Sequence, residues 1–373
     1  MSTHPTDRDE NELGEMDGDE SFSIPPTERK LITQPVDLSV QTLFEQWETK
    51  TLFLPDIQRE YVWDNGKASR LIESLLLNIP IPVLYFAETH DATYEIIDGH
   101  QRVKSIVRFL ANEFSLVGLH VLAEHRGLRF RQLPEREQRF MKMRTLRAII
   151  VSIDSHPAMK FEIFERLNTG AISLNAQELR NSVYRGALND LLRELAKGFT
   201  FRSLIGSKTP RRRMVDEELV LRFLALANAL GTYRTPLKRF LNDYMESEQK
   251  INSNELGRLR EVFERTVSAV SRLLGSSAFR ITGSDGKPIE KSVNRALFDA
   301  QMLACSWISG GLEKPDVERV RREVGGLSND LEFLDAVRRA TGDRARTFRR
   351  VRDTVEALKR SGLDFNVPYD LTK

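Results

Sequence analysis

The sequence predicts an α+β protein in which a small mixed domain precedes a mostly α-helical domain. Up to residue 153, short runs of apolar, β-prone residues alternate with the patterns of amphipathic helices. Beyond residue 175, nearly every segment shows the 3.6-residue period of a helix. Between these regions, Asn168-Thr169-Gly170 is typical of a helix end. We therefore expect the mixed domain at residues 36–172 and the helical domain at residues 173–373.

The elements of the mixed domain follow from local patterns. Val103, Ile106, Val107 and Leu110 are spaced as in the apolar stripe of an amphipathic helix. Two prolines within residues 78–82 exclude a helix there. In chain order, the expected elements are a helix at 40–47, a strand at 51–54, a helix around 71–76, strands at 83–86 and 94–97, a helix at 102–112, strands within 114–122, a helix at 134–142, a strand at 147–153 and a helix at 157–167.

The helical domain begins with a capping signal, because Asn175 is followed three residues later by Glu178. The helical period then recurs in long segments without an internal repeat. The expected helices include those at 217–230, 236–245, 256–274, 294–308 and 331–360.

Composition restricts the class of protein. The chain has 373 residues, of which 40% are hydrophobic and 29% charged, as in soluble globular proteins. Its net charge is only +2, so any surface that attracts nucleic acid must be local. Residues 1–35 are acidic and have few apolar side chains, so we expect a disordered tail there.

Cysteine usage and hydropathy indicate a cytoplasmic location. Cys305 is the one cysteine, which excludes an intramolecular disulfide and fits a reducing compartment. The acidic start has no apolar signal-peptide segment, and no apolar run reaches membrane-spanning length. We therefore expect no membrane partner.

The most informative stretch is residues 94–102, where a short strand should meet a helix through Asp98-Gly99-His100-Gln101-Arg102. The first turn of a helix favours anions, because its N–H groups and dipole point toward them. Gly99 lets a ligand approach the backbone closely, and Arg102 can bind two phosphate oxygens at once. A capping turn without a ligand would explain the same residues.

The other side chains of this stretch suit phosphate chemistry. Asp98 could hold Mg²⁺ or orient a water molecule, and Gln101 could position that water or a phosphate oxygen. His100 fits either a general base or an ordinary hydrogen-bonding residue.

Two further segments combine polar and aromatic residues. In the first, Gln58 and Arg59 precede Tyr61 and Trp63, so Arg59 could contact a phosphate and an aromatic ring could contact a base. The second segment, residues 165–170, contains Arg166 and Asn168 as candidate ligand contacts. Packing, salt bridges and a helix end are the structural alternatives for these two segments.

Basic residues cluster in two places that could contact DNA phosphates, or simply be solvated. The first cluster consists of Lys208, Arg211, Arg212 and Arg213. The second consists of Arg338, Arg339, Arg344, Arg346, Arg349, Arg350 and Arg352. The sequence contains no Walker A motif, no G-x-G-x-x-G motif and no Cys/His cluster for zinc. Its C-terminal half has no histidine-rich nuclease signature, because the last histidine is His156.

Several segments, in the same order, resemble the N-terminal domain family of GmrSD-type restriction endonucleases, which is related to ParB and sulfiredoxin. The resemblance covers about residues 35–250. Its matching segments are the "P-x-x-Q-R-x-Y-x-W" box at 55–63, the helix and proline turn at 71–82, the "D-G-Q-Q-R" box at 98–102, the "F-x-R-L-N-T-G" and "L-N-x-Q-E-L-R" segments at 164–180, and helical segments at 216–223 and 240–245. His100 stands where this box has its first Gln.

The resemblance implies a ParB/sulfiredoxin-like α+β domain joined to helices. In relatives, the D-G-Q-Q-R box binds and hydrolyses a nucleoside triphosphate, which gates attack on modified or foreign DNA in bacterial antiviral defence. Many relatives carry a C-terminal HNH-like nuclease domain that has no counterpart here, which points to a separate nuclease subunit. Sulfiredoxin chemistry needs a cysteine in this turn, whereas Cys305 is far along the chain.

The leading hypothesis is an NTP-binding protein, an Mg²⁺-dependent NTPase using ATP or GTP, that acts as a sensor or regulatory component of a restriction-like system. Asp98, His100, Gln101 and Arg102 would be the catalytic residues, with Asp98 also holding the metal. The residues that would bind the nucleotide are Gln58, Arg59, Tyr61, Gly99, Arg102, Arg166 and Asn168. The alternatives are a non-enzymatic ParB-like DNA-binding module and an antitoxin-like interaction protein, and a homo-oligomer stays open.

Overall fold

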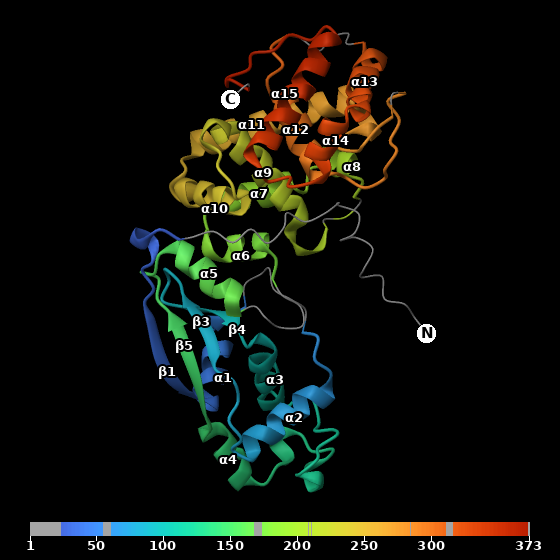
Figure 1. Cartoon of the computed structure of the whole chain (residues 1–373). Coiled ribbons are helices and arrows are strands. Elements are labelled where there is room, and N and C mark those ends of the chain that lie inside the picture. The colour runs from blue at the N-terminus through green and yellow to red at the C-terminus, as the bar shows by residue number, and fades with distance from the viewer. Residues whose placement is uncertain are drawn as a thin grey trace. The chain divides into compact units, whose positions relative to one another are not determined.

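The computed structural model describes residues 24–54, 61–167, 174–207, 209, 211–283, 285–310 and 316–371. It has the expected α+β composition, with a small sheet followed by helices (Figure 1). Contacts divide the described part of the chain into two compact units, Ile24–Leu174 and Asn175–Lys373. Most of the expected acidic tail and the expected domain boundary lie outside the described residues.

A five-stranded mixed sheet organises the first unit. Its strand order is β1-β5-β3-β4-β2. β1 (Thr33–Ser39) is antiparallel to β5 (Thr145–Val151), which is parallel to β3 (Leu84–Glu88). β3 is antiparallel to β4 (Tyr94–Asp98), which is parallel to the short β2 (Leu52–Phe53). The sheet therefore places β4, the strand of the Asp98 corner, one position from an edge.

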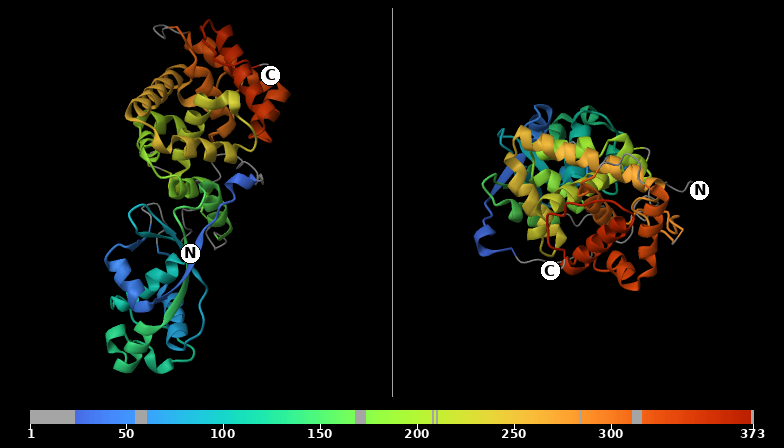
Figure 2. Two further views of the ribbon diagram at one scale, coloured as in Figure 1. Left: turned by 90° about the vertical axis from the view of Figure 1, so that its left-hand side faces the viewer. Right: turned by 90° about the horizontal axis from the view of Figure 1, so that it is seen from above.

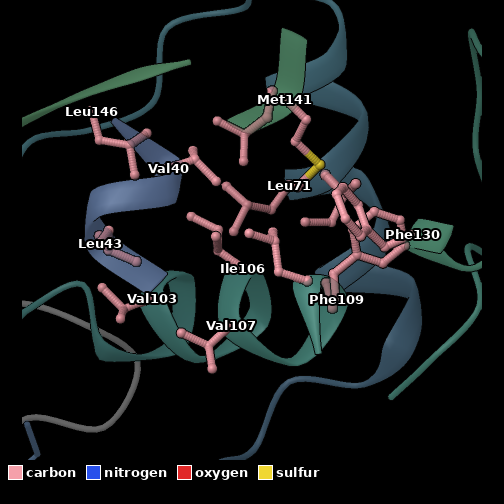
Figure 3. Packing of buried hydrophobic residues seen from close by; sticks show 14 of the residues in the cluster. Val40, Leu43, Leu71, Val103, Ile106, Val107, Phe109, Phe130, Met141 and Leu146 are labelled. Carbon is pink, nitrogen blue, oxygen red and sulfur yellow. The ribbon is translucent and has the colours of Figure 1, made fainter. Parts of the chain in front are cut away.

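Helices pack against this sheet through their apolar stripes. They are α1 (Val40–Glu48), α2 (Asn65–Leu76), α3 (His100–Leu110), α4 (Glu135–Met143) and α5 (Pro157–Leu167), with 3-10 turns at Pro26–Glu28, Ala123–His125 and Phe130–Gln132. Figure 3 shows side chains of α1 and α3, including Val40, Leu43, Val103 and Ile106, meeting in one apolar core. Burial of this core fixes the position of α3 behind the end of β4.

Order begins earlier than expected. The sequence suggested a disordered tail up to residue 35, but a 3-10 turn forms at Pro26–Glu28 and β1 starts at Thr33. The first residues of β1 are exposed, so the strand has no apolar alternation there to reveal it. Its partner β5 lies more than a hundred residues away, and local patterns do not encode that pairing.

The strands expected within residues 114–122 do not form, because this segment is a loop. Phe114, Leu116 and Leu119 are buried at nearly alternate positions, which gives the segment a strand-like pattern. Three of its backbone N–H groups donate to side chains of α2 instead of to a neighbouring strand. Ser69 Oγ accepts from Val117, and Glu73 Oε1 accepts from Val121 and Leu122 at 2.7 and 2.9 Å.

The second unit is helical apart from two isolated bridges within the described residues (Figure 2). Its helices are α6 (Ala176–Val183), α7 (Ala187–Leu195), α8 (Phe199–Ile205), α9 (Val215–Ala229), α10 (Leu237–Ser247), α11 (Ser253–Leu273), α12 (Arg295–Ser306), α13 (Val317–Gly326), α14 (Leu331–Arg338) and α15 (Arg344–Arg360), with 3-10 turns at Arg212–Met214, Leu230–Thr232, Glu248–Lys250, Gly275–Ser277 and Leu327–Asn329. The expected capping box forms between Asn175 and Glu178 at the start of α6.

The helix expected at residues 331–360 forms as two helices. The segment at 331–360 breaks between α14 and α15, where Ala340 has a φ of +42°. The break places Thr341 O against the buried side chain of Arg350, which donates to it at 2.7 Å. The helical period of the sequence continues across the break, so it did not reveal the turn.

A buried ionic cluster joins three helices of this unit. Asp299 of α12 is 0% exposed and accepts from Arg222 of α9 at 2.7 Å and from Arg350 of α15 at 3.2 Å. Both arginines are 1% exposed. Two cations share one carboxylate here, so the packing of the three helices depends on that carboxylate. No described helix is both long and apolar enough to cross a membrane.

Candidate nucleotide-binding corner

The Asp98 corner has the strand, turn and helix geometry that the sequence indicated. β4 ends at Asp98, Gly99 is the N-cap residue and α3 begins at His100. Gly99 has a φ of +94°, in the left-handed region that favours glycine. A Cβ atom at Gly99 would clash with Leu84 Cδ2 of β3 and approach the guanidinium of Arg102. Glycine is therefore required at this turn, and it provides no side chain to cap the first turn of α3.

Arg102 is held in place by several acceptors. Its Nη2 donates to Asp98 Oδ2 at 2.7 Å, and its Nη1 donates to the carbonyls of Pro82 and Val83, the latter at 3.3 Å. The Arg102 side chain is 13% exposed and that of Asp98 is 41% exposed. Burial lowers the pKa of Arg102, and the charge of Asp98 partly offsets this effect. Arg102 thus brings a positioned, partly desolvated cation to the corner.

The carbonyls that hold Arg102 were missed by the sequence reasoning. They come from Pro82 and Val83, at the end of the proline-containing turn before β3. The two prolines of that turn, Pro80 and Pro82, showed that the backbone is non-helical, and such backbone leaves carbonyls available to side chains. The proline turn therefore indicated free carbonyl groups. That Arg102 donates to them depends on the pairing of β3 with β4.

Gln101 connects the corner to the aromatic segment of residues 61–63. Its Oε1 accepts from the backbone N–H groups of Val62 and Trp63 at 3.2 and 3.3 Å. Its Nε2 lies 2.8 Å from His100 Nε2. An amide nitrogen can only donate, so His100 Nε2 is the acceptor in this contact and carries no proton. Gln101 therefore positions the neighbouring segment and also fixes the tautomer of His100.

Tyr61 lies against the same helix. Its hydroxyl is 2.9 Å from Ser105 Oγ, and Ser105 donates in turn to the carbonyl of Gln101 at 2.7 Å. The guanidinium of Arg108 lies 4.6 Å from the centre of the Tyr61 ring. Ser105 and Arg108 are additional residues of this site that the sequence reasoning did not identify. The structure therefore brings Tyr61 together with the Asp98 corner.

Arg166 has a different environment. It lies in the last turn of α5, its side chain is 78% exposed, and its Nε donates to Glu162 at 2.6 Å. α5 contacts β4, but the contact of Arg166 is with its own helix. The remaining candidates Gln58, Arg59 and Asn168 lie outside the described residues.

The donor set at the corner fits a metal ion only as part of a metal–nucleotide complex. No group of three or more His, Cys, Asp or Glu side chains that could hold a metal occurs in the described part of the chain. Mg²⁺ in phosphate-binding sites is held by one or two carboxylates together with phosphates and water. Asp98 is a partly exposed carboxylate next to the turn, so it could be that single ligand.

The second basic cluster is largely an ion-pair network. Arg344 lies 4.5 Å from the centre of the Phe348 ring. The other six arginines have carboxylates within 4.0 Å as follows: Arg338 with Glu290, Arg339 and Arg346 with Asp335, Arg349 with Asp330, Arg350 with Asp299, and Arg352 with Asp353. A cavity of about 650 Å³ between α13 and α15 has both acidic and basic side chains, including Arg322, Asp330 and Glu356. These contacts leave this region with little excess positive charge.

The first basic cluster is described only in part, since Lys208 and the side chain of Arg212 lie outside the described residues. Arg211 Nη1 is 3.9 Å from Asp216, and Arg213 Nη2 is 3.5 Å from Glu178. Burial raises the pKa of Asp216, an effect that the backbone N–H and the charge of Arg211 reduce. Both arginines therefore contribute to the packing of the helical unit.

A protein-family model matches most of the first unit and the start of the second. The model for "GmrSD restriction endonuclease, N-terminal domain" matches residues 40–185, which include the sheet from β2 onward, the Asp98 corner and α6. No curated protein matches the chain significantly. The family match indicates a role in a restriction-like defence system. Residues 40–185 of this chain belong to the family of GmrSD restriction endonuclease N-terminal domains.

Proposed function

We propose that this protein binds and hydrolyses a nucleoside triphosphate, with Mg²⁺, as a sensor or regulatory component of DNA-directed, restriction-like defence in the cytoplasm. The observation that carries the proposal is the Asp98 corner. There, a glycine in the left-handed region opens a helix whose first turn contains a positioned arginine. The family match, named for a restriction endonuclease, supports the defence setting.

The phosphates would bind at the first turn of α3. The N-terminus of a helix attracts anions, and Gly99 allows phosphate oxygens to approach the backbone. Arg102 lies in that turn and is mostly desolvated, which strengthens its attraction for an anion. Some of its N–H groups already contact Asp98 and backbone carbonyls, so in this proposal Arg102 acts through its charge and its remaining donors.

Tyr61 and Gln101 would position the ligand. Gln101 holds residues 62 and 63 against α3, and Tyr61 is held by Ser105. This arrangement keeps an aromatic ring near the phosphate-binding turn, where it can contact a base. The family resemblance adds Gln58 and Arg59, which immediately precede this segment in the sequence.

Asp98 and His100 would serve the hydrolytic step. Mg²⁺ bound with the nucleotide would neutralise charge on the phosphates. Asp98 would provide the protein ligand of this ion, while keeping its contact with Arg102. His100 Nε2 accepts from Gln101 and cannot take a proton from water while that hydrogen bond persists. We therefore assign Gln101 and His100 to positioning a water molecule.

The test is nucleotide binding and turnover by purified Arg102→Ala, measured with ATP and with GTP in the presence of Mg²⁺. Loss of a charge-assisted contact of ~1.5–3 kcal/mol should weaken binding by roughly 10- to 100-fold. Arg70→Ala, an exposed arginine of α2, is the matched control and should bind as the parent does. Arg102→Lys keeps the charge and should retain part of the affinity.

Arg102 also stabilises the corner, so the melting temperature of each variant must be measured. Asp98→Asn distinguishes metal binding from folding, because its amide oxygen can still accept from Arg102. This variant should lose nucleotide turnover more than nucleotide binding. If folded Arg102→Ala binds and hydrolyses both nucleotides as the parent does, the proposal fails.

A further inference from the structure

α4 and the turn before it expose basic side chains that neither the family match nor the corner explains. Residues 126–147 contain eight Arg or Lys residues and two Glu residues. The complete chain has a net charge of only +2, so the rest of the chain is net negative. Eight cations against two carboxylates make this segment locally basic. We call the exposed side chains Arg131, Arg136, Arg139, Phe140, Lys142 and Met143 the α4 surface.

Helical spacing places most of this set on one side of α4. Arg136, Arg139, Phe140 and Met143 stand at i, i+3, i+4 and i+7, and all are exposed. Met141 is 0% exposed and faces the core instead. Gln138 donates to the carbonyls of residues 131 and 133, which ties the preceding turn to the helix. Core packing and these hydrogen bonds therefore hold the residues of the α4 surface in position.

The cations of this surface remain largely uncompensated, in contrast to the network around Arg349. Arg136 lies 5.3 Å from the Phe140 ring centre and Lys142 lies 5.8 Å from that of Phe130. The one carboxylate pair, Arg139 with Glu135, is solvent-exposed on both sides and is therefore weak. Within the described residues, Arg131, Arg136 and Lys142 have no ion pair with a carboxylate.

Large apolar side chains are exposed among these charges. Phe140 is 45% exposed and Met143 is 73% exposed. Exposed apolar residues beside uncompensated cations are typical of a contact surface. A polyanion with apolar sugar and base edges satisfies both features.

We propose that the α4 surface binds the phosphate backbone of double-stranded DNA. An anionic membrane fits less well, because the exposed apolar residues on α4 are only Phe140 and Met143, and Glu135 and Glu137 lie on the same helix. Contacts made through a stripe of Arg and Lys do not read base sequence, so binding is independent of sequence. DNA is also the target class of the restriction-like role proposed above.

α4 and the end of β4 lie toward opposite ends of α3 (Figure 1). Asn112, just beyond the last residue of α3, accepts from Arg129 and from the backbone of Arg131, whereas Gly99 precedes its first residue. DNA binding here needs no nucleotide, so it adds to the proposed function without depending on it.

The experiment measures fluorescence anisotropy of a labelled 25-base-pair duplex without nucleotide, over a series of salt concentrations. The variant combines Arg136→Gln, Arg139→Gln and Lys142→Gln. Removing three phosphate contacts should lower affinity by about tenfold or more at ~0.1 M salt and reduce the salt slope by about 2 to 3. ATP and GTP binding should be unchanged.

The matched control removes the same charge from the helical unit by Arg338→Gln, Arg339→Gln and Lys359→Gln, all exposed ion-paired residues. It should bind the duplex nearly as the parent does. The proposal is overturned if the control loses as much affinity as the α4 variant, or if the parent does not bind the duplex. It is also overturned if the α4 variant loses binding only to phosphatidylserine vesicles. Failure of Arg102→Ala to affect nucleotide binding would leave the DNA result intact.

Discussion

At the scale of single residues, Gly99 determines the shape of the candidate site. Its backbone conformation turns the chain from β4 into α3, and the space where a side chain would begin is occupied by Leu84. The same turn brings Asp98 and Arg102 together across four residues. A substitution at Gly99 should therefore affect both stability and ligand binding.

We expect Gly99→Ala to cost about 2–4 kcal/mol of unfolding free energy. A left-handed conformation costs a non-glycine residue ~1–3 kcal/mol, and the clash with Leu84 adds to it. Gly127→Ala is the control, since Gly127 has a φ of +84° and open space where its Cβ would lie. Urea unfolding should show a larger loss for Gly99→Ala, and equal losses would refute the role of Leu84.

The sequence predicted single residues of the site where their contacts are local. Asp98, Gly99 and Arg102 lie within five positions, so the strand, turn and helix pattern sufficed to bring them together. Tyr61 was a candidate residue of the same site. Its contact with Ser105 of α3, forty-four positions away, was not predicted. The carbonyl partners of Arg102 depend on tertiary packing, and the local pattern could not identify them.

At the scale of elements, helices with a strong apolar stripe were predictable, whereas the ends and breaks of elements were not. α3 follows its stripe from Val103 to Leu110. The loop at 114–122 resembles a strand because nearly alternate residues are buried, but several of its backbone N–H groups donate to side chains of α2. The spacing of apolar residues predicts which side chains face a core. It does not predict which groups form hydrogen bonds with the backbone.

The three helices joined by Asp299 provide a test at this scale. Asp299→Ala leaves Arg222 and Arg350 buried without their shared carboxylate. Removing one partner of a buried ion pair costs about 3–5 kcal/mol. Chemical denaturation followed by circular dichroism should therefore show a large destabilisation of the helical unit.

The control for that test is Glu194→Ala, which removes the exposed partner of Arg260. Exposed ion pairs contribute little, because water and salt screen them. Its denaturation midpoint should stay close to that of the parent. If both substitutions shift the midpoint equally, the buried cluster does not hold the three helices together.

At the scale of the whole molecule, the α+β class was predictable because period 2 gives way to period 3.6 along the chain. The strand order was not predictable. β1 pairs with β5 across more than a hundred residues, and β3 lies between β5 and β4. These pairings depend on the packing of the entire unit. The sequence contains the excess of basic residues at 126–147, but only the structure shows which of these side chains are exposed.

The single cysteine provides a probe of the helical unit. Cys305 lies in α12, is 3% exposed, and burial raises the pKa of its thiol to about 12. A thiolate is the reactive form, so the native protein should not react with Ellman's reagent at neutral pH. Unfolding in urea should release one reactive thiol per chain, since the sequence contains one cysteine.

The pH dependence of this reaction should differ between the folded and the unfolded protein. Raising the pH from about 7 to about 9 deprotonates an unfolded cysteine, whose ordinary pKa is about 8.5, and should accelerate its reaction in urea. The folded thiol has a pKa well above this range, so its reaction should remain negligible at both values. Cys305→Ala provides the background. Rapid stoichiometric reaction of the folded parent at neutral pH would contradict the packing of α12, and with it the arrangement of helices around Asp299.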